Sequence, residues 1–335
     1  MTFIMDPLLY ASVARHGQLD FHQFSDTVAP GTFGYPPVLG GRFPGLHEQI
    51  HRGYRLLQGE HLSALTRSVG GRLLQGGGWR SAGLYDFCNA VVFEATFLAL
   101  FGGPAPGARH ADAGRLREAF VRFDSVFPLL IAQVPIGLLG RTGAARDRLL
   151  RGFLPHKVAS WCGGSLFVRT RCELLDRYEA LEDVDKAAHH LTILWASVGN
   201  TGPASFWALY HLLRHPEGLR RVRQELHAVL GPGAGGRDVK LDPEQLGRLV
   251  YLERRDQRPP STESAVSESL RLASASMNIR VAQEDFGLRL GGERTAAVRK
   301  GDFIALYPQS MHLDPEVYEE PQVRRRPPGG AALVS

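Results

Sequence analysis

Residues 191–213 form an apolar stretch (LTILWASVGNTGPASFWALYHLL) whose centre carries groups able to bind a ligand or hold a proton. Pro203 cannot donate a hydrogen bond to the carbonyl of Gly199, so a helix through this stretch should bend and leave that carbonyl free. The Asn200 amide and the Thr201 hydroxyl stand beside the opening. The length would suffice to cross a bilayer, but the polar centre argues against that. The stretch therefore predicts a long central helix that meets a ligand halfway along, or a kinked core helix without a ligand.

A carboxylate and a guanidinium, Glu268 and Arg271, lie one helical turn apart. Side chains at this spacing share a helix face, and a buried pair can form two parallel hydrogen bonds that fix its orientation. Glu217 and Arg220 have the same spacing, but a solvated surface pair is expected there. Glu268 and Arg271 follow the central stretch at a distance and precede a run of small residues and a strand signal at 278–282. This second pair is therefore the structural candidate.

Residues 47–51 (HEQIH) match the helix-borne zinc motif H-E-x-x-H, in which two histidines bind the metal and the glutamate acts as general base. A catalytic zinc needs a third protein ligand. The residues after His51 do not supply the glycine and histidine that one class of zinc proteases uses. A solvated helix face is the favoured interpretation. A metalloprotease remains the alternative, to be tested by zinc content and by mutation of Glu48.

Helical periodicity dominates the chain and indicates the elements that must position these groups. Apolar residues recur every three to four positions, or almost continuously, in the segments expected to be helical: 46–72, 85–101, 115–127, 191–213, 216–230 and 260–272. Strand signals are short and come late, at 278–282, 286–290 and 303–307. The sequence therefore predicts a mainly α fold with a small β part.

The composition limits the function classes. The chain has 335 residues, 44% of them hydrophobic and 22% charged, which is typical of a globular protein with a sizeable core. Its net charge of +5 is too dilute over this length to indicate nucleic-acid binding. Its three cysteines, Cys88, Cys162 and Cys172, cannot build a disulfide framework, so a reducing compartment is expected.

The order of these motifs resembles that of the cytochrome P-450 superfamily: a long kinked helix, an E-x-x-R helix, small strands and a D-P-x-x-[YF] segment, here within 312–318 (HLDPEVY). Residues 195–204 (WASVGNTGPA) resemble the central helix of the sterol and prostanoid branch. Residues 85–102, 269–290 and 304–318 are most similar to the sterol 7α-hydroxylases of that branch. Prostacyclin synthases and sterol 12α-hydroxylases share the central helix but are less similar afterwards, and they remain alternatives.

The resemblance implies roles for the central helix. Gly199, Asn200 and Thr201 would lie over the iron on the dioxygen side. Most family members place an acid and a threonine there to deliver protons, whereas this branch replaces that pair. Proton delivery would then depend on Asn200, Thr201, the Gly199 carbonyl and ordered water. The apolar walls around a sterol would include Trp195, Ala275 and Met277.

The resemblance also implies a cofactor and partners. The cofactor would be haem b, with Arg280 offering a cation to a propionate. Glu268 and Arg271 would be the structural pair that holds the segment under the haem. The implied activity is 7α-hydroxylation of a sterol, cholesterol in the first place, by a monooxygenase. It would act at the endoplasmic reticulum membrane with electrons from cytochrome P-450 reductase and without nucleic acid.

The resemblance covers residues 1–322, so we expect a partial cytochrome P-450 domain, truncated at both ends. Residues 254–263 (RRDQRPPSTE) are interpreted as an insertion and 323–335 as a tail outside the family pattern. The membrane anchor and the haem cysteine of F-x-x-G-x-x-x-C-x-G have no counterpart. Cys162 fits C-x-G, but it precedes the central helix and lacks the earlier Phe and Gly. We therefore expect no axial metal ligand, no thiolate-bound haem and no turnover, with a non-catalytic lipid-binding fragment as the alternative.

Overall fold

The computed structural model describes residues 1–73, 81–104, 112–231, 243–252, 265–290, 294–318 and 321. The chain divides into two compact units. The helical unit consists of Val28–Phe206 and Arg220–Leu249, and the sheet unit of Met1–Thr27, Trp207–Leu219 and Val250–Ser335. The predicted insertion at 254–263 and the predicted tail at 323–335 lie outside the described residues.

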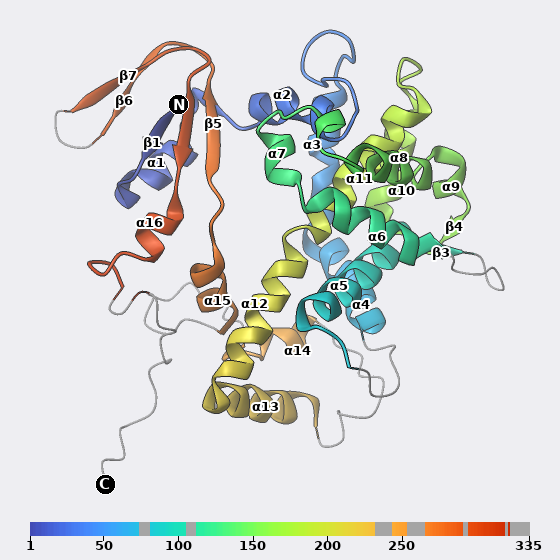
Figure 1. Cartoon of the computed structure of the whole chain (residues 1–335), viewed down its shortest axis with the longest axis vertical. Helices are drawn as coiled ribbons and strands as arrows, with labels where there is room; N and C mark the ends of the chain where they lie inside the picture. The colour runs from blue at the N-terminus through green and yellow to red at the C-terminus, as the bar shows by residue number, and fades with distance from the viewer. Residues whose placement is uncertain are drawn as a thin grey trace. The chain divides into compact units, whose positions relative to one another are not determined.

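The helical unit contains most of the helices (Figure 1). Three helices cross a boundary between the units: α2 (His22–Thr32), α12 (Thr201–Arg214) and α13 (Pro216–Leu230). The other helices of this unit are α3 (Leu46–Gly53), α4 (Gly59–Leu73), α5 (Leu84–Phe101), α6 (Asp112–Asp124), α7 (Phe127–Ile131), α8 (Thr142–Gly152), α9 (Pro155–Ala159), α10 (Leu166–Asp176), α11 (Asp183–Val198) and α14 (Pro243–Gly247). Two short 3-10 helices, η2 (Tyr54–Leu57) and η3 (Ile136–Leu138), and one strand pair, β3 (Gly103–Pro104) with β4 (Trp161–Cys162), complete it.

Aromatic side chains fill the core of the helical unit. Phe97 of α5 packs against Phe93, Phe101 and Phe153, with ring centroids 5.5–6.1 Å apart. The almost continuous apolar sequence of α5 is explained by this position, because a helix buried on several sides has no polar face. The next long core helix, α11, starts at a capping box in which the side chains of Glu182 and Asp185 satisfy backbone N–H groups at the helix start.

The sheet unit is built on a four-stranded sheet in the order β1-β8-β5-β2. Its strands are β1 (Thr2–Ile4), β2 (Leu19–Asp20), β5 (Asn278–Ala282) and β8 (Phe303–Leu306), and a separate hairpin pairs β6 (Phe286–Arg289) with β7 (Thr295–Val298). Its short helical elements are η1 (Pro7–Leu9), α1 (Tyr10–Ala14), α15 (Ala265–Ala273) and α16 (Pro308–His312). β1 runs parallel to β8 and β5 runs antiparallel to it. The mainly α fold with a small β part is confirmed.

Two expectations from the sequence are wrong in detail. The helix expected over 46–72 consists of α3, η2 and α4, because Gly59 has a φ of +55° that ends the helical path between η2 and α4. Strands also occur early, at β1 and β2, where none was expected from local patterning. Both are only two or three residues long and acquire strand geometry by pairing with segments far away in the sequence.

Candidate active site

The central stretch is divided into two helices at the predicted position. α11 ends at Val198 and α12 begins at Thr201, with Gly199 and Asn200 between them. The Gly199 N–H still donates to the Trp195 carbonyl at 2.8 Å, and the Ala204 N–H donates to the Asn200 carbonyl at 3.1 Å. Pro203 has no N–H to offer the Gly199 carbonyl, which accounts for the break at this point. The sequence therefore placed the irregularity correctly.

The hydroxyl groups near the break bond to the backbone. Thr201 Oγ1 donates to the Ser197 carbonyl at 2.8 Å, and Ser197 Oγ donates in turn to the Ile193 carbonyl at 2.8 Å. A hydroxyl that donates its proton in this way can still accept a hydrogen bond from another group. Asn200 and Thr201 are exposed, so both can meet a ligand or water at the break.

Trp195 is fixed by two contacts within the helical unit. Its Nε1–H donates to Asp124 Oδ1 at 2.9 Å, and its indole stacks on Phe127 with centroids 3.9 Å apart. Burial raises the pKa of the Asp124 carboxyl above its usual value, and the hydrogen bond from Trp195 opposes that rise. Sequence reasoning missed Asp124. The signal was a carboxylate at the end of an amphipathic helix, between the aromatic residues Phe123 and Phe127.

Two glycines near the break allow close packing. A Cβ on Gly199 would lie 2.9 Å from the Trp195 carbonyl oxygen and 3.4 Å from Asp124 Oδ1. A Cβ on Gly202 would lie 2.3 Å from Asn89 Oδ1 of α5. Distances of 2.9 and 2.3 Å are not tolerated without movement of the neighbour, so Gly202 lets the start of α12 lie directly against α5, and Gly199 leaves room for the Trp195 carbonyl.

The E-x-x-R pair lies in the sheet unit and is buried. Arg271 Nε and Nη2 donate to the two Glu268 carboxylate oxygens at 2.8 and 2.7 Å. Arg271 Nη1 donates to the carbonyls of His312 and Pro321, and the guanidinium carbon lies 4.5 Å from the Tyr318 ring centroid. Arg271 therefore connects α15 to the D-P-x-x-Y segment about fifty residues later. By contrast, Glu217 and Arg220 are exposed.

The remaining predicted site residues of the sheet unit lie in the connection between α15 and β5 or on β5 itself. Ala275 and Met277 are exposed in the connection, and Arg280 lies on β5. Arg280 Nη1 donates to the Ile279 carbonyl at 2.9 Å, and its guanidinium carbon is 5.8 Å from the Phe21 ring. The predicted site is thus divided: Trp195 and the residues of the break belong to the helical unit, and the other candidates belong to the sheet unit.

The sequence and the fold of the chain both match known proteins. Residues 84–323 match the sequence model of the family described as Cytochrome P450. This is more than half of the chain, and the chain therefore belongs to the cytochrome P450 family. A solved structure, retinoic acid bound cyanobacterial CYP120A1, matches with a TM-score of 0.64 and 17% identity over 96% of this chain and 70% of that one. At that identity the match shows the fold alone.

Two of the relatives by sequence are named for 7α-hydroxylation of a sterol. The chain is 37% identical to rat 25-hydroxycholesterol 7-alpha-hydroxylase over 91% of its length. It is 36% identical to Cricetulus griseus cholesterol 7-alpha-monooxygenase over 95%, and 36% identical to mouse cytochrome P450 7B1 over 96%. The chain spans 73%, 65% and 64% of these three relatives, respectively. The metalloprotease alternative has no support from this family, although the rings of His47 and His51 do lie 4.5 Å apart.

Membership of this family implies a haem-iron cofactor, and in this family a cysteine thiolate would hold the iron. Burial raises the pKa of Cys88 and raises that of Cys172 to about 11, so both thiols are protonated at neutral pH. Cys162 is exposed in β4. All three cysteines precede the break in the central stretch, whereas the family pattern places the axial cysteine after the D-P-x-x-Y segment. None of the three therefore stands at the position in the chain that the family uses for the iron ligand.

Among the described residues, one helix is long and apolar enough to cross a membrane, α5 at Leu84–Phe101. A core helix satisfies the same criterion, and α5 contributes Phe93, Phe97 and Phe101 to the core of the helical unit. The helix is therefore weak support for a membrane span.

Proposed function

We propose that the chain serves 7α-hydroxylation of a sterol, within a haem-dependent monooxygenase. The observation that carries this proposal is the similarity to relatives named for sterol 7α-hydroxylation, and the break in the central helix supports it. At that interruption Asn200 and Thr201 offer an amide and a hydroxyl to a ligand, and Trp195 is held in place by Asp124. In this proposal the chain's residues bind and orient the sterol and hold protons at the break.

The finer assignments follow from the same proposal. Cholesterol is the first substrate to test, with the 25-hydroxylated sterol and a 12α-hydroxylase substrate as the alternatives. The electron donor is cytochrome P-450 reductase, the site of action is the endoplasmic reticulum membrane, and the cofactor is haem b. Arg280 is assigned to a propionate, and Ala275 and Met277 to the sterol pocket.

The positions of the three cysteines in the chain support a second part of the proposal: the 335-residue chain alone forms no thiolate-ligated haem and does not turn over sterol. The test is a carbon monoxide difference spectrum of the reduced, haem-supplemented chain. We expect no thiolate-type Soret band, and we expect Cys88→Ser, Cys162→Ser and Cys172→Ser to leave the spectrum unchanged. A thiolate-type band that disappears in one of these variants would assign that cysteine as the ligand and overturn this part.

A non-catalytic sterol-binding role is the second candidate, favoured by the same lack of a fitting thiol. Equilibrium binding of radiolabelled cholesterol to the haem-free chain distinguishes the two. Saturable binding that Thr201→Val weakens while the half-buried control Thr66→Val of α4 does not would support recognition at the break without haem. Binding that appears only after haem is added would support the monooxygenase assignment alone.

A further inference from the structure

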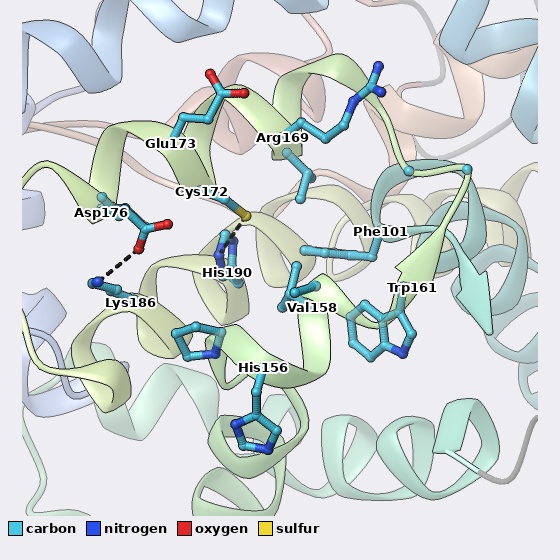
Figure 2. Close-up of a pocket in the computed structure, with 16 residues that line it drawn as sticks. Phe101, His156, Val158, Trp161, Arg169, Cys172, Glu173, Asp176, Lys186 and His190 are labelled. Carbon is cyan, nitrogen blue, oxygen red and sulfur yellow. Dashed lines mark hydrogen bonds and ion pairs between the residues drawn. The ribbon is translucent and has the colours of Figure 1, made fainter. Parts of the chain in front are cut away.

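A cavity of about 680 Å³ lies in the helical unit, away from the break in the central helix (Figure 2). It is bounded by α9, β4, α10, the first half of α11 and the C-terminal end of α5. His190, which lines it, precedes Gly199 by nine residues, or ~13 Å along a helix axis. A volume in the range of about 300–1,000 Å³ is typical of pockets for small organic ligands.

The inner wall of this cavity is apolar. Figure 2 shows Phe101, Val158 and Trp161 gathered on one side, below α10. Val168 and Leu175 of α10 are buried and also line the cavity. A ligand would therefore bury most of its surface against hydrocarbon and aromatic groups, which favours an apolar body.

Two uncharged polar groups interrupt this wall. Cys172 Sγ and His190 Nε2 share a hydrogen bond at 3.5 Å. The His190 ring is 2% exposed, and its Nδ1 has no hydrogen-bond partner in the described part of the chain. Burial lowers the pKa of His190 to about 3 and raises that of Cys172 to about 11. Both groups are neutral at pH 7, so the pair offers hydrogen-bonding atoms without charge in an otherwise apolar wall.

The charges at the mouth balance one another. Lys186 Nζ donates to Asp176 Oδ1 at 2.8 Å, with the Asp176 side chain 61% exposed. Arg169 and Glu173, one of each sign, are exposed on α10 and extend their charged ends away from the apolar wall in Figure 2. Since its one ammonium at the mouth is already paired, the cavity offers no unbalanced charge to attract an ionic ligand.

Close backbone contacts fix the wall of the cavity where the end of α5 meets β4 and α10. Gly102 has a φ of +86°, and a Cβ there would lie 2.3 Å from the Cys162 carbonyl oxygen. Ser165, at the start of α10, donates from both N and Oγ to the Leu100 carbonyl, at 2.8 and 3.0 Å. These contacts join the end of α5 to β4 and α10, so the pocket walls are held by backbone rather than by side chains alone.

We propose that this cavity is a second ligand site, which binds a neutral, largely apolar alcohol through a hydrogen bond to the Cys172–His190 pair. The site is separate from the break at Gly199 and Asn200, and its occupancy does not require haem. The alcohol hydroxyl bonds at the wall where Cys172 Sγ and His190 Nε2 meet, and the chain of the ligand packs against Phe101, Val158 and Trp161.

Three matched probes test the chemistry by equilibrium dialysis against the purified chain: farnesol, its carboxylate analogue farnesoic acid and the hydrocarbon farnesene. We expect saturable farnesol binding, with farnesoic acid at pH 7.5 at least about tenfold weaker because its charge would be desolvated without a partner. Farnesene should bind about three- to tenfold more weakly than farnesol, since it lacks the hydrogen bond. Equal binding of the carboxylate, or no saturable farnesol binding, would overturn the proposal.

Variants locate the binding. Val158→Trp, which fills the cavity, should weaken farnesol binding at least about tenfold, whereas Val184→Trp, exposed on α11 and outside the lining, should not. His190→Phe should remove the preference for farnesol over farnesene. Thr201→Val should leave farnesol binding unchanged. Loss of binding in Thr201→Val, or full binding in Val158→Trp, would place the ligand elsewhere.

A thiol measurement decides the question if a cavity variant fails to fold. In Cys162→Ser, which removes the exposed cysteine, methyl methanethiosulfonate modification of Cys172 is followed by mass spectrometry of its peptide. Saturating farnesol should slow that modification, because the thiol lies in the wall of the occupied cavity. Modification at the same rate with and without farnesol would contradict the proposal.

Discussion

At the scale of single residues, Arg271 joins α15 to a segment of the sheet unit that lies far away in the sequence. Its guanidinium satisfies both oxygens of Glu268 and reaches two backbone carbonyls of a segment more than forty residues away. Both partners are almost fully buried, at 5% and 2% side-chain exposure. A buried ion pair of this kind contributes little net stability relative to an apolar pair, but removing one partner leaves a charge without compensation.

Glu268→Gln should therefore destabilise the chain by about 3 kcal/mol, because Arg271 would remain buried and charged. The matched control is Glu244→Gln, which removes a pair of the same chemistry whose side chains are 61% and 79% exposed. That control should change stability by less than about 1 kcal/mol. Urea unfolding followed by circular dichroism measures both, and equal effects of the two substitutions would show that the Glu268 pair is not buried in solution.

At the scale of elements, the break between α11 and α12 is held by packing as well as by Pro203. Gly202 brings the first turn of α12 against Asn89 of α5, at a distance that leaves no room for a Cβ. At Gly199 a Cβ would instead meet the Trp195 carbonyl oxygen, a backbone atom that no substitution removes. A second substitution can therefore relieve the clash of a Cβ at Gly202 but not that of a Cβ at Gly199.

Gly202→Ala should cost about 1–3 kcal/mol through overpacking against Asn89. Asn89→Ala should restore most of that loss in the double variant, because the clashing atom is the Asn89 side-chain oxygen. Gly199→Ala should not be rescued by Asn89→Ala. A double-mutant cycle on thermal unfolding measures the coupling, and a coupling energy near zero would contradict the close approach of α12 to α5.

The elements also show where sequence patterning was sufficient. The apolar run of α5 and the strands β5, β6 and β8 were predicted from local periodicity, and the break was expected within a few residues of its position. The subdivision of 46–72 was missed because the deciding feature is a single positive φ at Gly59. Local periodicity did not indicate β1, because three residues carry too little periodic signal and its strand geometry depends on pairing with β8.

At the scale of the whole molecule, acid sensitivity is built into the core of the helical unit. His189 and His190 are buried, and burial is the main cause that lowers the pKa of each to about 3, with Arg171 acting in the same direction. An unfolded chain binds protons at these histidines below about pH 6.5, whereas the folded chain does not. Stability contributed by the neutral rings is thus fully present above about pH 6.5 and is lost as the pH falls towards 3.

The wild-type chain should accordingly lose up to about 2 kcal/mol per ring between pH 7 and pH 5. His189→Phe/His190→Phe keeps aromatic rings in place and should reduce that loss, while His156→Phe, exposed at the pocket mouth, should not. Urea unfolding at the two pH values provides the comparison. An unchanged pH dependence in the double variant would mean that the two rings are accessible to protons in the folded state.

The sequence by itself determined the family, the mainly α fold, the position of the central break and the spacing of Glu268 and Arg271, because each of these is encoded by residues that are close together in the chain. Only the tertiary structure decided that Trp195 binds Asp124, that Arg271 holds the carbonyl of Pro321, and that Cys172 and His190 line a cavity with Trp161. Those contacts join helices and loops separated by many residues. Periodicity describes one element at a time, whereas the partners of a side chain are set by how the elements pack.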